Sequence, residues 1–153
     1  MTLTWTLKPF DALTLTELYD LLRLRVEVFV VEQNCPFQDI DGTDDLAYHL
    51  LGHTETGELA AYARLFDAGI SYEQVAIGRV AVARAHRRHG LGQALMRHAV
   101  AQCAVLFGPQ PIKIGAQLYL EKFYQGFGFV QCGEGYLEDG IPHIPMLRGA
   151  TLD

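Results

Sequence analysis

The sequence has few cysteines and no long apolar run. Cys35, Cys103 and Cys132 are an odd set without C-x-x-C spacing, which argues against a disulfide framework or a zinc site. No apolar run approaches the ~20 residues that a membrane span requires. Residues 1–8 also lack the basic start and the continuous apolar core of a signal peptide. We therefore expect no metal centre, no membrane partner and a cytoplasmic location.

Positive charge is also scarce. The chain has 12 Lys and Arg residues against 18 Asp and Glu residues, which gives a formal net charge of −6. This balance argues against nucleic acid as the main partner, whereas a cationic amine would meet a favourable field. The segment 79–98 is the exception, because it holds five arginines and three histidines. A basic segment in an acidic protein predicts a local anion site.

The patterning predicts one α/β domain, residues 1–153, with a mixed, mostly antiparallel sheet. Three strands joined by turns form a meander, and a βαβ crossover then places two strands parallel and side by side. The expected order is β-α-β-β-β-α-β-α-β-β. Expected strands are 2–8, 46–53, 58–65, 75–82, 112–117, one that begins at 127, and 143–148; expected helices are 14–31, 91–107 and 118–125.

The most informative segment runs from Val80 to Leu95 as a strand, a basic glycine-containing loop and a helix. The first turn of a helix leaves backbone N–H groups without partners, and the helix dipole adds partial positive charge there. Glycines let a diphosphate approach the backbone, and Arg87 and Arg88 add charge. The segment therefore predicts a pyrophosphate cradle. The alternative is an ordinary helix start with surface arginines.

Two other nucleotide motifs fit this loop poorly. A P-loop ends in Gly-Lys-Ser/Thr, but Gly92 is followed by Gln93 and Ala94. A dinucleotide fingerprint needs Gly or Ala where Leu95 stands. A nucleotide-binding domain stays open as an alternative that binding of ATP or NAD would reveal.

Two segments of the chain resemble the GNAT acetyltransferases. Arg87-Arg-His-Gly-Leu-Gly92 is similar to the family's Arg/Gln-x-x-Gly-x-Gly/Ala motif. The segment 117–129 is similar to one in which an Asn, a Tyr and a Gly-Phe pair recur, with Gln117 in place of the usual Asn. The segments 25–36 and 140–145 resemble the ElaA-like branch. The likeness implies the GNAT fold, with a central βαβ crossover and helices on both faces of the sheet.

The resemblance implies acetyl-CoA as the co-substrate. Strands 75–82 and 112–117 would splay apart and admit the pantetheine arm, which would pair with the backbone of the first strand. The loop amides would bind the pyrophosphate. The implied cofactor-binding residues are Val80, Ala81, Val82, Arg87, Arg88, His89, Gly90, Leu91, Gly92, Gln93, Gln117 and Tyr124.

The implied reaction is acetyl transfer to a primary amine by direct attack in a ternary complex. A backbone N–H near Val80 would polarise the thioester carbonyl, and Tyr124 matches the family's usual general acid. Many family members carry a Glu base on the strand equivalent to 75–82, but none stands there in this sequence. The candidates for the base are His49 and His143, followed by Glu32, because histidine titrates near neutral pH.

The acidic segment 38–45 is interpreted as a solvated loop. Charged groups are rarely buried without a partner, so Arg64 and Arg79 on inner strands are expected to pair with Asp41 or Asp44, or to hold a substrate carboxylate.

Two rival functions stay open. Residues 25–29, Asp41, Asp44, Tyr48 and 64–65 resemble the first half of acyl-homoserine lactone synthases, which acylate an amine derived from an amino acid, usually from an acyl carrier protein. The chain is alternatively a non-catalytic sensor of acetyl-CoA. The acceptor is left open among small amines, amino acids, peptides and protein lysines, and a homodimer is also left open.

Overall fold

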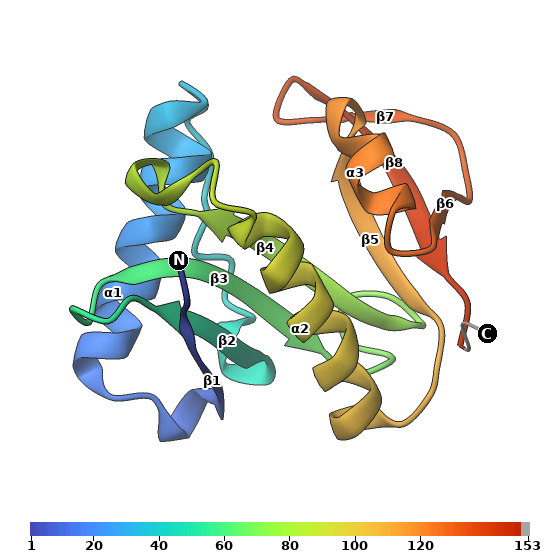
Figure 1. Ribbon diagram of the computed structural model, residues 1–153. Coiled ribbons are helices and arrows are strands. Elements are labelled where there is room, and N and C mark those ends of the chain that lie inside the picture. Colours follow the sequence, from blue (N-terminus) through green and yellow to red (C-terminus); the bar gives the residue numbers. More distant parts are fainter. Residues whose placement is uncertain (151–153) are drawn as a thin grey trace.

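The computed structural model describes residues 1–150, whose strands form one sheet in the order β1-β2-β3-β4-β5-β8-β6, with β7 paired to β8 (Figure 1). The strands are β1 Thr4–Pro9, β2 Tyr48–His53, β3 Leu59–Phe66, β4 Val75–Val82, β5 Ile112–Gln117, β6 Phe129–Gln131, β7 Tyr136–Glu138 and β8 Ile141–Arg148. The helices are α1 Leu15–Val26, α2 Leu91–Phe107 and α3 Glu121–Gln125.

The sheet is mixed and mostly antiparallel, as predicted. Among the strand pairs of the described chain, β4 and β5 alone run parallel. The connection between them contains α2, so the predicted βαβ crossover is confirmed. The predicted meander of β2, β3 and β4 is confirmed as well.

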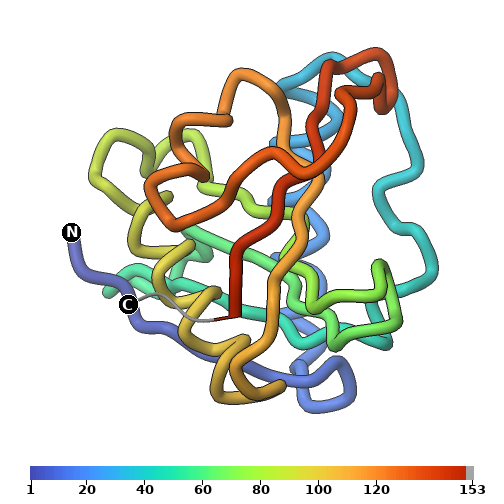
Figure 2. Tube along the Cα trace, turned by 90° about the vertical axis from the view of Figure 1, so that its right-hand side faces the viewer, coloured from blue at the N-terminus to red at the C-terminus, as the bar shows by residue number. Residues whose placement is uncertain are grey.

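Helices cover both faces of the sheet, as Figures 1 and 2 show. Leu21 of α1 packs against Leu51 and Tyr62 on one face. Leu95 of α2 belongs to a larger core on the other face, which includes Leu50. Successive side chains of a strand point to opposite faces, so the neighbours Leu50 and Leu51 of β2 contact different helices.

The helix boundaries follow from local chemistry. The N-terminus of α1 has a capping box: the Glu17 N–H donates to Thr14 Oγ1 over 3.0 Å, and the Thr14 N–H donates to Glu17 Oε1 over 2.9 Å. α2 ends at Gly108, whose φ of 81° suits glycine. The predicted helix 14–31 is divided, because α1 stops at Val26 and a π-helical turn, Glu27–Glu32, follows.

The strand β7 was not predicted. Its three residues are all exposed, so no alternation of buried and exposed positions marks them in the sequence. β8 begins at Ile141, two residues before the predicted start, and pairs with β7 through that extension. Within residues 1–150, no helix combines the length and the apolar character needed to cross a membrane.

Candidate active site

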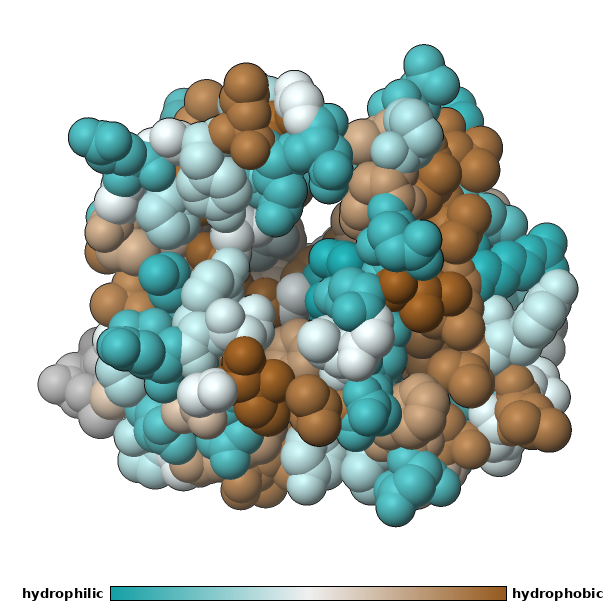
Figure 3. Space-filling model, turned by 180° about the vertical axis from the view of Figure 1, so that it is seen from behind, coloured by the Kyte–Doolittle hydropathy of each residue, from teal (hydrophilic) through white to brown (hydrophobic). Residues whose placement is uncertain are grey.

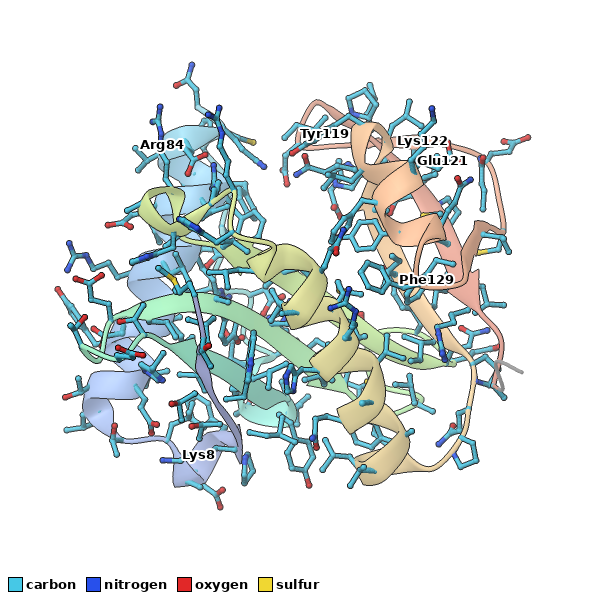
Figure 4. The ribbon with its side chains drawn as sticks, viewed as in Figure 1. Lys8, Arg84, Tyr119, Glu121, Lys122 and Phe129 are labelled. Carbon is cyan, nitrogen blue, oxygen red and sulfur yellow. The ribbon has the colours of Figure 1, made fainter. Side chains whose placement is uncertain are left out.

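The candidate active site is a cleft between β4 and β5. These strands pair only at Val75–Ile112 and Ala76–Lys113, and they diverge beyond those positions, so the predicted wedge is present. The cleft has a volume of about 380 Å³. Seen from behind, the surface is notched at its upper edge (Figure 3). Arg84, in the turn after β4, and Tyr119, in the turn after β5, lie on opposite sides of the opening (Figure 4).

The N-terminus of α2 supplies backbone donors beside the cleft. No other group in residues 1–150 accepts a hydrogen bond from the N–H groups of residues 88–93. Arg88 and Gly90 both have φ of 70°, and no side chain caps the helix. A Cβ at Gly90 would meet nothing within 4 Å, so this side of the loop is open. The loop has the donors and the space that a diphosphate requires.

The predicted loop residues differ in exposure. Arg88, His89 and Gly90 are exposed, whereas Leu91 is buried in the core below α2. Gly92 lies against the ring of Phe123 in α3, where an added Cβ would be 3.6 Å away. Gln93 is exposed and lines a second groove, between α2 and α3.

Arg87 does not present a free guanidinium to the cleft. Its Nη1 and Nη2 donate to the Glu32 carboxylate over 2.5 and 2.9 Å, and its Nε donates to the Val82 carbonyl over 3.1 Å. We expected mobile charge for the pyrophosphate at this position. The Arg87 side chain instead connects the loop to the π-helical turn that follows α1. Glu32 is not among the residues that line the cleft.

The strand residues predicted to contact the pantetheine arm occupy both sides of β4. Val80 lines the cleft. Ala81 points to the opposite face of the sheet and packs with α1, and Val82 packs on the α2 side. Gln117 lies across the cleft at the end of β5. The structure thus brings Val80 and Gln117 to facing walls of one cleft.

Tyr124 lines the same cleft from α3. The residue is 7% exposed, and burial raises the pKa of its phenol to about 12. The neighbouring ring of Phe123 packs edge-on against it, with 5.1 Å between the centroids. The phenol therefore stays protonated across the neutral range, the state that a proton donor needs.

His143 also reaches the cleft, from β8. Its Nδ1 lies 2.7 Å from the carbonyl oxygen of Ile141. Because a carbonyl oxygen only accepts, this nitrogen carries the hydrogen in the neutral ring, and Nε2 keeps a lone pair. Glu138 Oε2 lies 3.4 Å from Nε2, and the ring of Tyr136 stacks on the imidazole at 5.6 Å. The neutral imidazole can therefore accept a proton at Nε2.

His49, the other histidine candidate, lies elsewhere. It is fully buried and does not line the cleft. Its Nε2 lies 2.9 Å from the carbonyl oxygen of Asp44, and its Nδ1 lies 2.6 Å from the hydroxyl of Tyr62. Burial lowers the pKa of His49, so the ring is neutral and both nitrogens are occupied. We therefore do not retain His49 as a base, because no substrate amine can reach it.

The segment 38–45 is not simply a solvated loop. Asp39 and Asp44 are 3% and 7% exposed, and both bind the fully buried guanidinium of Arg25. Buried aspartates need such partners to offset the loss of hydration. Leu21 and Arg25 are four residues apart, so they lie on the same face of α1, and both are 0% exposed. This spacing is the sequence signal that could have identified Arg25 as a buried arginine.

Arg64 pairs with Asp41 and Asp44, as expected, whereas Arg79 pairs chiefly with Asp39. Arg64 Nη1 donates to Asp44 Oδ1 over 2.9 Å, and its Nη2 donates to Asp41 Oδ2 over 2.6 Å. The hydrogen bonds from Arg64 hold the pKa of Asp41 well below its usual range. Burial alone would raise the pKa of Asp44, but Arg25 and Arg64 lower it further than burial raises it. Both carboxylates are therefore ionised at neutral pH.

Metal ligands are not grouped in this cleft. Nowhere in residues 1–150 do three or more His, Cys, Asp or Glu side chains gather in a way that could hold a metal ion.

The chain is similar to known proteins over nearly its whole length. A family profile described as an acetyltransferase (GNAT) domain matches residues 20–148. Protein ElaA of Escherichia coli K12 is 50% identical over 139 residues, which cover 89% of this chain and 90% of ElaA.

Two crystal structures show the same fold. An acyl-CoA N-acyltransferase from Pseudomonas aeruginosa is 47% identical, with 97% of this chain and 100% of that chain covered, and has a TM-score of 0.92. Escherichia coli ElaA is 45% identical in the structural alignment, with 96% and 99% covered, and has a TM-score of 0.88.

Proposed function

This chain belongs to the GNAT acetyltransferase family, in its ElaA-like branch, and from this premise we propose that it transfers an acetyl group from acetyl-CoA to a primary amine. The observation that carries the proposal is a cleft between diverging strands that is lined by Tyr124 and His143, with the open N–H groups of a helix N-terminus at the end of one of those strands. Direct attack in a ternary complex needs all three.

Acetyl-CoA would extend from the N-terminus of α2 into the cleft. The N–H groups of residues 88–93 would bind the pyrophosphate, with Arg88 as the exposed cation of the loop. The pantetheine arm would lie along β4 beyond Ala76, where β5 no longer pairs with it. Its amides would satisfy backbone groups that the divergence leaves without strand partners.

The chemistry assigns one task to each polar group. The amine nitrogen attacks the thioester carbon, so a C–N bond forms while the C–S bond breaks. The Val80 N–H would stabilise the negative charge that develops on the carbonyl oxygen. His143 Nε2 would take the proton that the amine loses, and the Tyr124 hydroxyl would protonate the departing thiolate. Both side chains line the cleft.

The charges of the cleft favour a cationic amine as the acceptor. The lining guanidiniums of Arg64 and Arg79 are already matched by aspartates. Glu138 and Asp139 also line the cleft, from the β7–β8 hairpin, and neither pairs with a Lys or Arg of residues 1–150. An ammonium group would be attracted there, whereas the carboxylate of an amino acid would meet no unmatched cation.

Calorimetric titration with acetyl-CoA tests the donor site, with ATP and NAD as controls. We expect selective binding of acetyl-CoA and its loss in Gly92→Val, whose side chain would project beside the diphosphate. A Cβ at this position would lie 3.6 Å from the Phe123 ring, so the melting temperature of the variant should be measured to show that it is folded. Tight binding of ATP or NAD, or normal affinity in the variant, would contradict the assigned cradle.

Thiol release in the presence of candidate acceptors tests the reaction itself. Diamines and amino acids of similar length should be compared, and we expect faster release with diamines. Binding without thiol release from any amine would favour a sensor of acetyl-CoA. Transfer only from an acyl carrier protein to an amino-acid-derived amine would favour the lactone-synthase alternative.

A further inference from the structure

Arg79 has a backbone conformation that is unusual for its residue type. Its φ is 51°, in the left-handed region that L-residues with a side chain rarely adopt. It lies at an irregularity of β4: Ala81 pairs with Tyr62 and Gly78 pairs with Arg64. Arg79 and Val80 therefore oppose the single residue Ala63, which is a β-bulge.

The bulge lies next to the part of the cleft where acyl transfer is proposed to occur. β4 pairs with β5 only up to Ala76, and Val80, directly after Arg79, lines the cleft wall. The proposed function uses the Val80 N–H to stabilise the developing oxyanion. The direction of that N–H depends on the backbone conformation at the bulge, and hence on what holds Arg79.

Asp39 holds Arg79 at two points. The Arg79 Nε donates to Asp39 Oδ1 over 2.8 Å, and its Nη2 donates to the Asp39 carbonyl oxygen over 3.0 Å. The guanidinium also lies over the ring of Phe37, 5.6 Å from its centroid. A planar fork held in this way fixes the side chain and, through it, the backbone.

Asp39 is in turn fixed by a second arginine. Arg25 Nε donates to Asp39 Oδ2 over 3.0 Å, and Arg25 Nη2 donates to the same Asp39 carbonyl oxygen over 2.9 Å. Arg25 is fully buried at the end of α1, and Asp39 is 3% exposed. The bulge is thereby connected through Asp39 to the helix on the far face of the sheet.

We propose that Arg79 is a positioning residue for acyl transfer: held by Asp39, it keeps the β4 bulge in the left-handed conformation that places the Val80 backbone against the thioester. The inference rests on the proposed function. Arg79 lines the cleft, but its charge is matched by Asp39, and Asp41 Oδ2 lies 3.6 Å from Nη2. It acts on the reaction through the backbone of its neighbour, without binding the acceptor.

Three substitutions at this position separate the backbone from the side chain. Arg79→Ala loses the contacts to Asp39 and keeps a Cβ that disfavours positive φ, so kcat should fall roughly 10²-fold, as when an oxyanion donor is lost. Arg79→Gly loses the same contacts but adopts positive φ readily, so it should regain most of that kcat. Arg79→Lys keeps the charge without the fork and should lie between them. The KM for the acceptor should stay near the wild-type value in all three.

A purely structural role would not produce this pattern. Arg79→Ala and Arg79→Gly remove the same hydrogen bonds, so both should lower the melting temperature, yet only the alanine variant should lose kcat. The matched control is Arg23→Ala, which removes an exposed arginine that pairs with Glu27, and it should leave kcat and acceptor KM unchanged. Equal kcat losses in Ala and Gly with a raised acceptor KM would overturn the proposal and make Arg79 a binding residue. A wild-type kcat in Arg79→Ala would overturn it as well.

The amide chemical shift of Val80 gives a readout that does not need turnover. It should move away from the wild-type position in Arg79→Ala and return toward it in Arg79→Gly. If the wild-type protein acetylates no amine, the proposed function fails, but this shift pattern still decides whether Arg79 sets the bulge. If the Val80 amide chemical shift is the same in Arg79→Ala as in the wild type, Arg79 does not set the conformation of the bulge.

Discussion

Arg87 donates hydrogen bonds from both terminal nitrogens of its guanidinium to the carboxylate of Glu32, over 2.5 and 2.9 Å. The two residues are 55 positions apart, and they join the turn after α1 to the loop before α2. Because the pair cancels the charge of Arg87, the proposed binding of a pyrophosphate at residues 88–93 would rely mainly on backbone N–H groups and on Arg88. Because Glu32 is held by Arg87, its carboxylate is not placed to act as a base in the cleft.

Glu32→Gln should therefore strengthen the binding of acetyl-CoA. Removing the carboxylate leaves the positive charge of Arg87 beside the pyrophosphate cradle, and a charge-assisted contact is worth enough for a several-fold effect, roughly 3- to 10-fold in Kd. Calorimetry measures the affinity, and thiol release should show that most of kcat is retained. A kcat loss of about 10²-fold, typical of a removed general base, would restore Glu32 as the base.

Tyr124→Phe should lower kcat by about 10²-fold, the usual contribution of a positioned proton donor. The affinity for acetyl-CoA should change little, because the variant loses one hydroxyl from a well-packed ring. Steady-state thiol release and calorimetry measure the two quantities. An unchanged kcat would remove the general-acid assignment.

The pH dependence of the wild-type enzyme tests the same residue. Burial raises the pKa of the Tyr124 phenol to about 12, so the proton-donating form persists well above the pH at which an ordinary tyrosine ionises, about 10. The profile of kcat should show no alkaline decline up to about pH 10, measured with thiol release. A decline centred between about pH 8 and 9 would show that another group supplies the proton, or that the phenol is far more acidic than its burial implies.

His143→Gln should lower kcat with little effect on binding of acetyl-CoA, because the imidazole lines the cleft beside the β7–β8 hairpin, where the acceptor is proposed to bind. The expected loss is about 10²-fold at neutral pH and smaller at alkaline pH, where more of the amine is already deprotonated. The matched control is His49→Asn, which removes two buried hydrogen bonds. It should lower the melting temperature while most of kcat remains; a larger kcat loss there than in His143→Gln would reverse the two roles.

Acidification should destabilise the ion-pair network of the segment 38–45. The folded-state pKa of Asp41 lies below its unfolded value, chiefly through the hydrogen bonds from Arg64. The stability that Asp41 contributes is therefore complete above its unfolded pKa of about 3.9 and is lost as the pH falls toward the folded pKa. Melting temperatures measured between about pH 6 and pH 2.5 should fall steeply below pH 4, and less steeply in Asp41→Asn. Asp45→Asn, at an exposed aspartate without an ion pair in residues 1–150, should leave the slope unchanged.

The sequence by itself determined the features that depend on near neighbours. Residue spacing along the chain predicts the capping box of Thr14 and Glu17, because it depends on local backbone geometry. The same kind of spacing predicts the meander, the crossover helix and the loop at the start of that helix. The resemblance in residues 87–92 and 117–129 then placed the diverging strands and Tyr124 on one cleft. These predictions needed no knowledge of contacts between distant segments.

Only the tertiary structure decided which charged and titratable side chains are free to act on a substrate in the cleft. His49 and His143 look equivalent in the sequence, yet one is fully enclosed by Tyr62 and Asp44 and the other faces the cleft. Arg87 and Glu32 cancel each other across 55 residues, and Asp39 joins Arg25 to Arg79 across the sheet. The reason is physical: burial and pairing set the state of a charge, and both depend on groups that the fold brings together from far along the chain.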